Sequence, residues 1–285
     1  MKSYSEADLA ILMRSLNIPS CPAILSELNA ELRKDNCNQL RVVALISKDV
    51  ALSAAVLKIT NSASASNSRK VTSIKDAITL LGTQNLVNFV VGDFLKRSLS
   101  IPKSKSLDRF WDKAAHNATV CGLLADRFRG APRETAYCFG LFHDCGIPVM
   151  MQRYPDYKKT LQIVSQSGQA FTATEEAQHG TDHAIIGYLL ARSWGLADTL
   201  GEAIRSHHEY EVLDSNTDIG ISHEACTLIA ISLISEHIVD LFLHLPEAHG
   251  WPREVALITG FFGISQTELE DLIEDTLFHL QQHAA

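Results

Sequence analysis

The chain has 285 residues, of which 46% are hydrophobic and 20% charged, and its formal net charge is −8 at pH 7. These proportions are ordinary for a soluble globular protein, and the length suits one large domain or two small ones. Because an acidic balance argues against bulk binding to nucleic acid, we expect no nucleic-acid partner.

The first part of the chain has the apolar spacing of helices, and the alternation typical of strands is nearly absent. Ser73 and Gly82 bracket one segment as a helix cap and a helix stop. Residues 100–106 are polar, contain a proline and lack periodicity, which favours a linker. The predicted helices before this linker cover residues 5–16, 22–34, 39–47, 50–60, 74–81 and 85–99.

The second part continues the helical pattern, with Ser106 and Thr181 as predicted caps and a polar loop before residue 181. Ser265 and Glu268 have the spacing of a capping box. The predicted helices cover residues 107–128, 133–154, 157–165, 182–194, 198–208, 223–242, 251–260 and 265–282. The expected fold class is therefore all-α, in two helical lobes.

The cysteines and the apolar stretches bear on the cellular compartment. The six cysteines include no CxxC pair, so no disulfide framework is expected and a reducing cytoplasm is the natural location. Residues 1–14 lack a signal-peptide pattern. The longest apolar stretch, 227–235, falls short of the roughly 18 residues that a membrane span needs, so we expect no membrane partner.

The pair His143-Asp144 lies inside an almost wholly apolar run, residues 137–147. Ionisable groups in an apolar helix are costly unless each finds a partner, and metal coordination is one way to supply it. Other histidines stand on separate predicted helices, which a bundle could bring to one point. The candidate metal ligands are His116, His143, Asp144, His183, His207 and His208.

A structural explanation stays open beside the metal site, because histidine and aspartate networks also satisfy themselves by hydrogen bonding. Adjacent residues on a helix point ~100° apart, so His207 and His208 cannot both face one site unless the helix frays there. If a metal is bound, it would be a divalent transition metal such as Fe, Mn, Ni or Zn.

Several segments resemble the HDOD proteins, the HD-related output domain branch of the HD superfamily. The resemblance covers roughly residues 15–245. The matching segments are Ile18-Pro19-Ser20-Cys21-Pro22, Ile46-Ser47-Lys48-Asp49-Val50-Ala51-Leu52, Lys58-Ile59-Thr60-Asn61-Ser62, Ser73-Ile74-Lys75-Asp76-Ala77-Ile78, Gly140-Leu141-Phe142-His143-Asp144-Cys145-Gly146, Asp182-His183-Ala184-Ile185-Ile186-Gly187 and Ala203-Ile204-Arg205-Ser206-His207-His208.

The resemblance implies one HDOD domain over residues 15–245, with a helical extension over 246–285 packed on it. It places a first helical lobe at about 1–99, the linker at 100–106 and an HD-like helical lobe at 107–245. It also implies a role in bacterial signal transduction, with signalling proteins as partners, and many members of the family are non-catalytic relatives of HD phosphohydrolases.

Two departures from the family patterns favour a non-catalytic protein. Active HD hydrolases close their metal site with an aspartate after an alanine, whereas here Ile231 follows Ala230, and an apolar side chain donates no oxygen ligand. His223 and Glu236 are nearby ligand types, but neither aligns with the missing aspartate. The Gly-Tyr-Pro triplet of the cyclic-dinucleotide phosphodiesterase branch is also absent after His208.

The sequence therefore supports two hypotheses. The first is a regulatory module with a degenerate HD metal site and no catalytic residues, which acts by binding a protein or a small ligand. The second is a metal-dependent phosphohydrolase acting on a nucleotide or another phosphoester. In this hypothesis His116, His143, Asp144 and His183 would hold metal, with His207 or His208 completing a second site, and Asp144 would bridge two ions.

Overall fold

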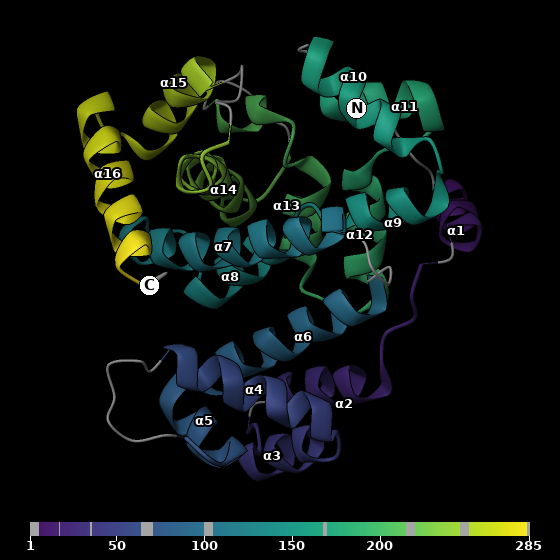
Figure 1. Cartoon of the computed structure of the whole chain (residues 1–285), viewed down its shortest axis with the longest axis vertical. Coiled ribbons are helices and arrows are strands. Elements are labelled where there is room, and N and C mark those ends of the chain that lie inside the picture. Colours follow the sequence, from purple (N-terminus) through teal and green to yellow (C-terminus); the bar gives the residue numbers. More distant parts are fainter. Residues whose placement is uncertain are drawn as a thin grey trace. The chain divides into compact units, whose positions relative to one another are not determined.

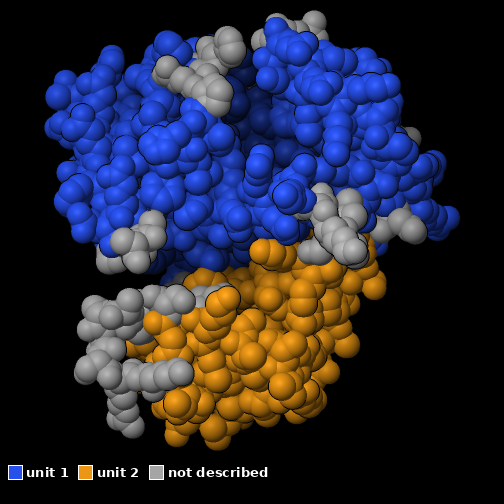
Figure 2. Space-filling model, viewed as in Figure 1, with its two compact units in different colours: residues 1–18, 101–192, 196–285 blue, residues 19–100, 193–195 orange. Residues whose placement is uncertain are grey.

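The computed structural model of the chain describes residues 6–16, 18–34, 36–63, 71–99, 105–167, 170–214, 220–245 and 251–283. These ranges consist of helices joined by turns and contain no β-strand, which confirms the all-α prediction (Figure 1). The chain divides into two compact units, which Figure 2 shows in different colours. One comprises residues 19–100 with 193–195, and the other comprises 1–18, 101–192 and 196–285.

The smaller unit is a set of helices whose ends follow the cap signals in the sequence. The Ser73 hydroxyl accepts a hydrogen bond from the Asp76 amide at 3.0 Å, and Gly82 ends the same helix with a φ of +81°. The cap-and-stop prediction is therefore confirmed. The helices are α2 (Ala23–Leu32), α3 (Gln39–Ser47), α4 (Val50–Ala63), α5 (Ile74–Leu81) and α6 (Thr83–Leu99).

A short distant segment, residues 193–195, completes this smaller unit. Trp194 is fully buried, and its indole donates a hydrogen bond to the carbonyl of Pro19 at 2.9 Å. In return, the Trp194 carbonyl accepts from the Asn29 amide at 3.1 Å. Because a buried indole N–H needs a partner, this exchange ties the segment to α2 and to the residues just before it.

The larger unit contains the remaining helices. The first, α1, precedes the smaller unit in the sequence but packs in the larger one, where Leu9 joins a cluster with Ile185 and Leu189. The helices are α1 (Glu6–Ser15), α7 (Lys105–Arg127), α8 (Arg133–Phe142), α9 (Gly146–Arg153), α10 (Tyr157–Ser167), α11 (Phe171–His179), α12 (His183–Ser193), α13 (Asp198–Ser206), the 3₁₀ helix η1 (Tyr210–Leu213), α14 (His223–Phe242), α15 (Trp251–Phe262) and α16 (Gln266–His283).

Two predicted elements of this unit are wrong. The single helix over 133–154 is two helices, α8 and α9, separated by a turn at residues 143–145. The polar loop expected before Thr181 contains a helix, α11, whose polar surface hid its period. Of the predicted linker, residues 100–104 lie outside the described residues, and Lys105 and Ser106 already belong to α7.

Close backbone contact between α7, α8 and α14 builds the core around the His-Asp turn. A Cβ at Gly140 would lie 2.6 Å from the backbone oxygen of Asn117, so only glycine lets α8 approach α7 this closely. The Ser235 hydroxyl of α14 donates to the Asn117 side-chain oxygen at 3.1 Å. These contacts hold the end of α8 and the second half of α14 against the middle of α7.

Helix α14 differs from the expectation that no apolar stretch is long enough to span a membrane. Its 20 residues are long and apolar enough to cross a membrane by length and composition, but 72% of the apolar window is buried inside the unit. Among the described residues no other single helix meets this criterion. A mostly buried helix of this kind is typical of the core of a globular protein.

Near the C-terminus, the predicted capping box is confirmed. The Glu268 carboxylate accepts from the backbone N–H of Ser265 at 2.8 Å, while the Ser265 hydroxyl accepts from the Glu268 N–H at 3.2 Å. In the preceding helix, α15, the ring of Phe262 stacks on the ring of Phe128, the residue that follows α7, with ring centres 3.8 Å apart. Residues 251–283 are thus part of the larger unit.

Glu254 of α15 gives the fold a pH-dependent stability. Burial, with the charge of Glu236 nearby, raises the pKa of Glu254 to about 7. The folded chain therefore holds this proton more tightly than the unfolded chain does. Its contribution to stability is complete below about pH 4.5 and is lost as the pH rises through about 7.

We expect Glu254→Gln to unfold at higher urea than the wild type at pH 8, and at the same urea at pH 4. Each pH unit between the two pKa values corresponds to about 1.4 kcal/mol, but partial contact with water reduces the gain to about 1 kcal/mol. Urea unfolding followed by circular dichroism at both pH values measures it. The exposed Glu274→Gln is the control, and an equal gain at pH 4 would contradict the assignment.

Candidate metal centre

The His-Asp pair lies in a turn between two helices. The backbone N–H of His143 still bonds to Phe139, but α8 ends at Phe142 and α9 begins at Gly146. Pro148 lies in the first turn of α9, where a missing N–H costs nothing. A turn can direct two adjacent side chains to one place, which a continuous helix cannot do.

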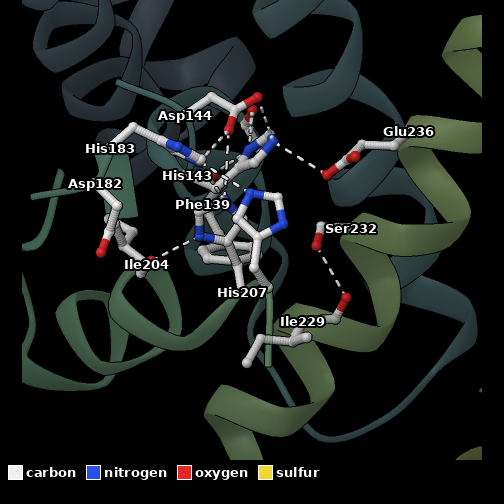
Figure 3. A network of polar contacts seen from close by, with 12 residues as sticks. Phe139, His143, Asp144, Asp182, His183, Ile204, His207, Ile229, Ser232 and Glu236 are labelled. Atoms are coloured by element: carbon white, nitrogen blue, oxygen red, sulfur yellow. Dashed lines mark hydrogen bonds and ion pairs between the residues drawn. The ribbon is translucent and has the colours of Figure 1, made fainter. Parts of the chain in front are cut away.

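Asp144 connects the histidines of the cluster, and dashed lines in Figure 3 join its carboxylate to their rings. One oxygen of its carboxylate is 3.4 Å from the Nε2 atoms of both His183 and His207. The His208 Nε2 is 2.9 Å from the His183 Nε2. One ligand atom from each of Asp144, His183, His207 and His208 lies within 4.8 Å of the others, so the four could hold one metal ion.

The end of α13 explains why both adjacent histidines reach this cluster. The helix stops at Ser206, and His207 and His208 form a turn before η1. The His207 Nδ1 donates to the Ile204 carbonyl at 2.7 Å, which leaves its Nε2 directed at the cluster. His207 and His208 can face one site only if the helix ends before them, and the structure meets this condition.

His183 begins α12, and Asp182 is the residue that caps it. The Asp182 carboxylate accepts from the Ile185 N–H at 2.9 Å, so the cap is Asp182 rather than the predicted Thr181. This cap fixes the direction in which α12 starts. The His183 side chain, which is fully buried, therefore enters the cluster from the first turn of the helix.

Glu175 is a buried residue of the site that the sequence analysis missed. Its carboxylate accepts from the Nδ1 of His183 at 2.6 Å and from the His183 backbone N–H at 3.1 Å. Its other oxygen accepts from the Tyr157 hydroxyl. Such a carboxylate behind a histidine orients the ring and raises its basicity as a ligand. Recognising α11 as a helix would have directed attention to Glu175.

Glu236 of α14 brings a second carboxylate to the cluster. It lies 3.2 Å from the Nε2 of His143, which is 3.4 Å from Asp144 (Figure 3). One turn further along α14, Asp240 pairs with Lys113 of α7 at 2.6 Å. Ile231 is fully buried, and Figure 3 shows Ser232 and Glu236 on the part of α14 beside the histidines.

His116 lies on α7, outside the cluster. Its ring contacts Phe242 of α14, with ring centres 5.0 Å apart. Among the described residues, the group of side chains whose ligand atoms converge does not include it. The structure thus brings together His183, His207 and His208 around Asp144, with His143 in contact with Asp144, and places His116 against an aromatic ring.

The electrostatics of the cluster favour a positive charge at its centre. Burial opposes the charge of Asp144, but His143, His183 and His207 hold its pKa well below the usual range. Burial also opposes protonation of His143, yet Asp144 and Glu236 raise the pKa of His143 to about 10. Burial and the neighbouring His207 and His183 lower the pKa of His208, which stays neutral.

The tautomers of the histidine rings show whether a cation fits between the side chains of the cluster. The Nδ1 atoms of His143, His183 and His207 face the acceptors Gly140 O, Glu175 and Ile204 O, so each donates from Nδ1. In the neutral rings the Nε2 lone pairs then face the Asp144 carboxylate or one another, which is repulsive. The Nε2 of His143 is buried between the carboxylates of Asp144 and Glu236, at 3.4 and 3.2 Å, without a well-aligned hydrogen bond to either. A proton or a metal cation between these atoms removes the repulsion, so the donor set fits a divalent metal.

The fold and this centre define an all-α domain of the HD type. The HDOD domain family model matches residues 18–210, well over half of the chain. The chain therefore belongs to the HDOD family, which confirms the resemblance drawn from its motifs. Glu236 and the helices from α14 onward lie outside the matched residues.

Known proteins are similar in fold but distant in sequence. A provisionally named phosphohydrolase from Shewanella amazonensis SB2B is 23% identical with a TM-score of 0.73, covering 97% of this chain and 98% of that one. An HDOD domain protein of unknown function from Geobacter sulfurreducens is 20% identical with a TM-score of 0.72, covering 97% of both chains.

A curated relative is longer than this chain. An uncharacterized protein of Treponema pallidum (strain Nichols) is 27% identical over 194 residues, which are 67% of this chain and 38% of that protein. The chain thus spans well under half of the length of this relative. The likeness to the solved structures establishes the fold, and the HDOD family model establishes the family.

Proposed function

We propose that this chain is a signal-transduction module that holds one divalent transition metal ion in its HD-type centre and acts by binding a partner. The observation that carries the proposal is the convergence of Asp144, His183, His207 and His208 within 4.8 Å. The buried Glu175 behind His183 supports it, because metal-ligating histidines characteristically donate their second nitrogen to a carboxylate.

The types of ligand narrow the choice of metal ion. Imidazole nitrogens and one carboxylate suit Fe, Mn, Ni or Zn, whereas Mg²⁺ and Ca²⁺ prefer oxygen ligands. In such a centre the bound ion would supply Lewis-acid activation of water and neutralise negative charge on a phosphoester. The residues of this chain would hold the ion and fix the ring orientations through Glu175, Ile204 and Gly140.

A regulatory role is favoured because the converging group contains a single carboxylate. Phosphoester hydrolysis by two metals needs ligands for both ions, and bridging carboxylates are the usual means of neutralising them. The position on α14 where active HD hydrolases carry an aspartate holds Ile231, which is fully buried. We therefore propose signalling proteins as partners, in a cytoplasmic setting, without a nucleic-acid or membrane partner.

A metal-dependent phosphohydrolase is the second candidate, and Glu236 is the observation that favours it. Its carboxylate, 3.2 Å from His143, could replace the missing aspartate as a ligand for a second ion. In this candidate Asp144, His183, His207 and His208 would hold one ion, and His143 and Glu236 would hold a second. A nucleotide or another phosphoester would be the substrate.

The first experiment is elemental analysis of the purified full-length chain, paired with a generic phosphodiesterase assay in added manganese. We expect near-stoichiometric transition metal and no turnover. Turnover that falls at least tenfold in Glu236→Gln, with an unchanged rate in the control Glu134→Gln, would replace the regulatory proposal with the hydrolase. A chain without metal after reconstitution with Mn²⁺, Fe²⁺, Ni²⁺ and Zn²⁺ would refute both candidates.

A further inference from the structure

A second site lies beside the metal centre, in a cavity of about 700 Å³ in the larger unit. Side chains of α12 and α13, with Ile221 and Ser222, line it. Ser206 and Glu209 line this cavity, while His207 and His208, between them in the sequence, belong to the metal cluster. A cavity of this size suits a small metabolite.

Arg205 is the feature that indicates a ligand. Its Nε is buried and has no hydrogen-bond partner in the described part of the chain. Its guanidinium lies over the Tyr188 ring, 5.6 Å from the ring centre. No ion pair within 4 Å engages Arg205 among the described residues.

A guanidinium held this way needs an acceptor. Buried donors are nearly always hydrogen-bonded, and the planar fork of arginine matches a carboxylate or a phosphate with two parallel bonds. Stacking on Tyr188 limits the rotation of the guanidinium, so less conformational entropy is lost when an anion binds. Arg192 of α12 lines the same cavity and adds a second positive charge.

One acidic residue of the cavity, Glu202, already has hydrogen-bond partners. Glu202 accepts hydrogen bonds from the Ser222 hydroxyl at 2.6 Å and from the Ser222 N–H at 3.2 Å. Glu209 and Ser206 also line the cavity, and their carboxylate and hydroxyl groups can hydrogen-bond hydroxyl or amino groups of a ligand.

We infer that this cavity binds a small metabolite that carries a carboxylate or phosphate group. Arg205 donates hydrogen bonds to that group, and Glu209 contacts hydroxyl or amino groups of the same metabolite. This inference deepens the proposed regulatory function, because it gives the small-ligand partner a site separate from the metal. The two can fail separately, since metal analysis tests the cluster and anion titration of metal-free protein tests the cavity.

The test is titration of the chelator-treated full-length chain with inorganic phosphate and, separately, with acetate, followed by ³¹P and ¹³C NMR line broadening. We expect saturable binding of at least one anion, weakened at least tenfold by Arg205→Gln and less by Arg205→Lys, which keeps the charge but not the fork. The anion that binds more tightly distinguishes a phosphorylated ligand from a carboxylated one.

Arg253→Gln is the matched control, because Arg253 is exposed on α15, where it pairs with Glu211. It should bind the anion as the wild type does. Circular dichroism shows whether each variant is folded, and Arg205→Lys keeps the test decisive if Arg205→Gln does not fold. Binding equal to wild type in both Arg205 variants, or no saturation by either anion, would overturn the inference.

Discussion

Asp144→Asn is expected to reduce bound metal from near one ion per chain to less than a tenth of that value. The Asp144 carboxylate lies between His183 and His207, 3.4 Å from each, and carries the negative charge that balances a cation. Asparagine keeps the shape but removes the charge, and even losing an outer-shell partner typically costs 10–100-fold in metal affinity. Elemental analysis after dialysis against a defined free-metal concentration measures the effect.

The control for this prediction is Asp126→Asn. Asp126 is exposed on α7 and pairs with Arg133, so its replacement should leave the metal content unchanged. Asparagine has nearly the same size as aspartate and keeps a hydrogen-bonding side chain, so we expect the variant to fold. Wild-type metal content in Asp144→Asn would show that the four converging residues do not form the centre.

Gly146→Ala is expected to destabilise the larger unit by about 3 kcal/mol, the upper end of the usual cost of overpacking, because the added Cβ meets rigid backbone. A Cβ at Gly146 would lie 2.0 Å from the backbone oxygen of His183 and 2.7 Å from its carbonyl carbon. Backbone at the start of α12 cannot move aside without shifting His183. The variant should therefore lose metal affinity together with stability, as urea unfolding and metal titration would measure.

Gly260→Ala is the matched control for that substitution. Gly260 lies in α15, and a Cβ there would meet no atom within 4 Å. Alanine in a helix interior is more stable than glycine by about 0.5–1 kcal/mol, so this variant should gain stability. If Gly146→Ala unfolded at the same urea concentration as wild type, the close approach of α9 to His183 would be refuted.

Helix existence was predictable where local chemistry decides it. The Ser73 cap and the Gly82 stop depend on residues a few positions apart, and so does the capping box of Ser265 and Glu268. Helix α11 was missed because most of its surface is polar, although its inward residues Thr174 and Glu175 are buried. When the buried positions of a helix are polar, its hydrophobicity shows no helical period, and the segment cannot be told from a loop by that pattern.

The amino-acid sequence by itself determined the all-α class, the HDOD family and the candidate status of His143, Asp144, His183, His207 and His208. These depend on residue types, short motifs and helical period, which are local properties. Only the tertiary structure decided that α8 ends before His143, that α13 ends before His207, that His116 lies against Phe242, and that Glu175 and Glu236 reach the histidines. The reason is physical: packing between helices distant in the sequence sets where a helix breaks and which polar residue is buried, and those contacts leave no local signal.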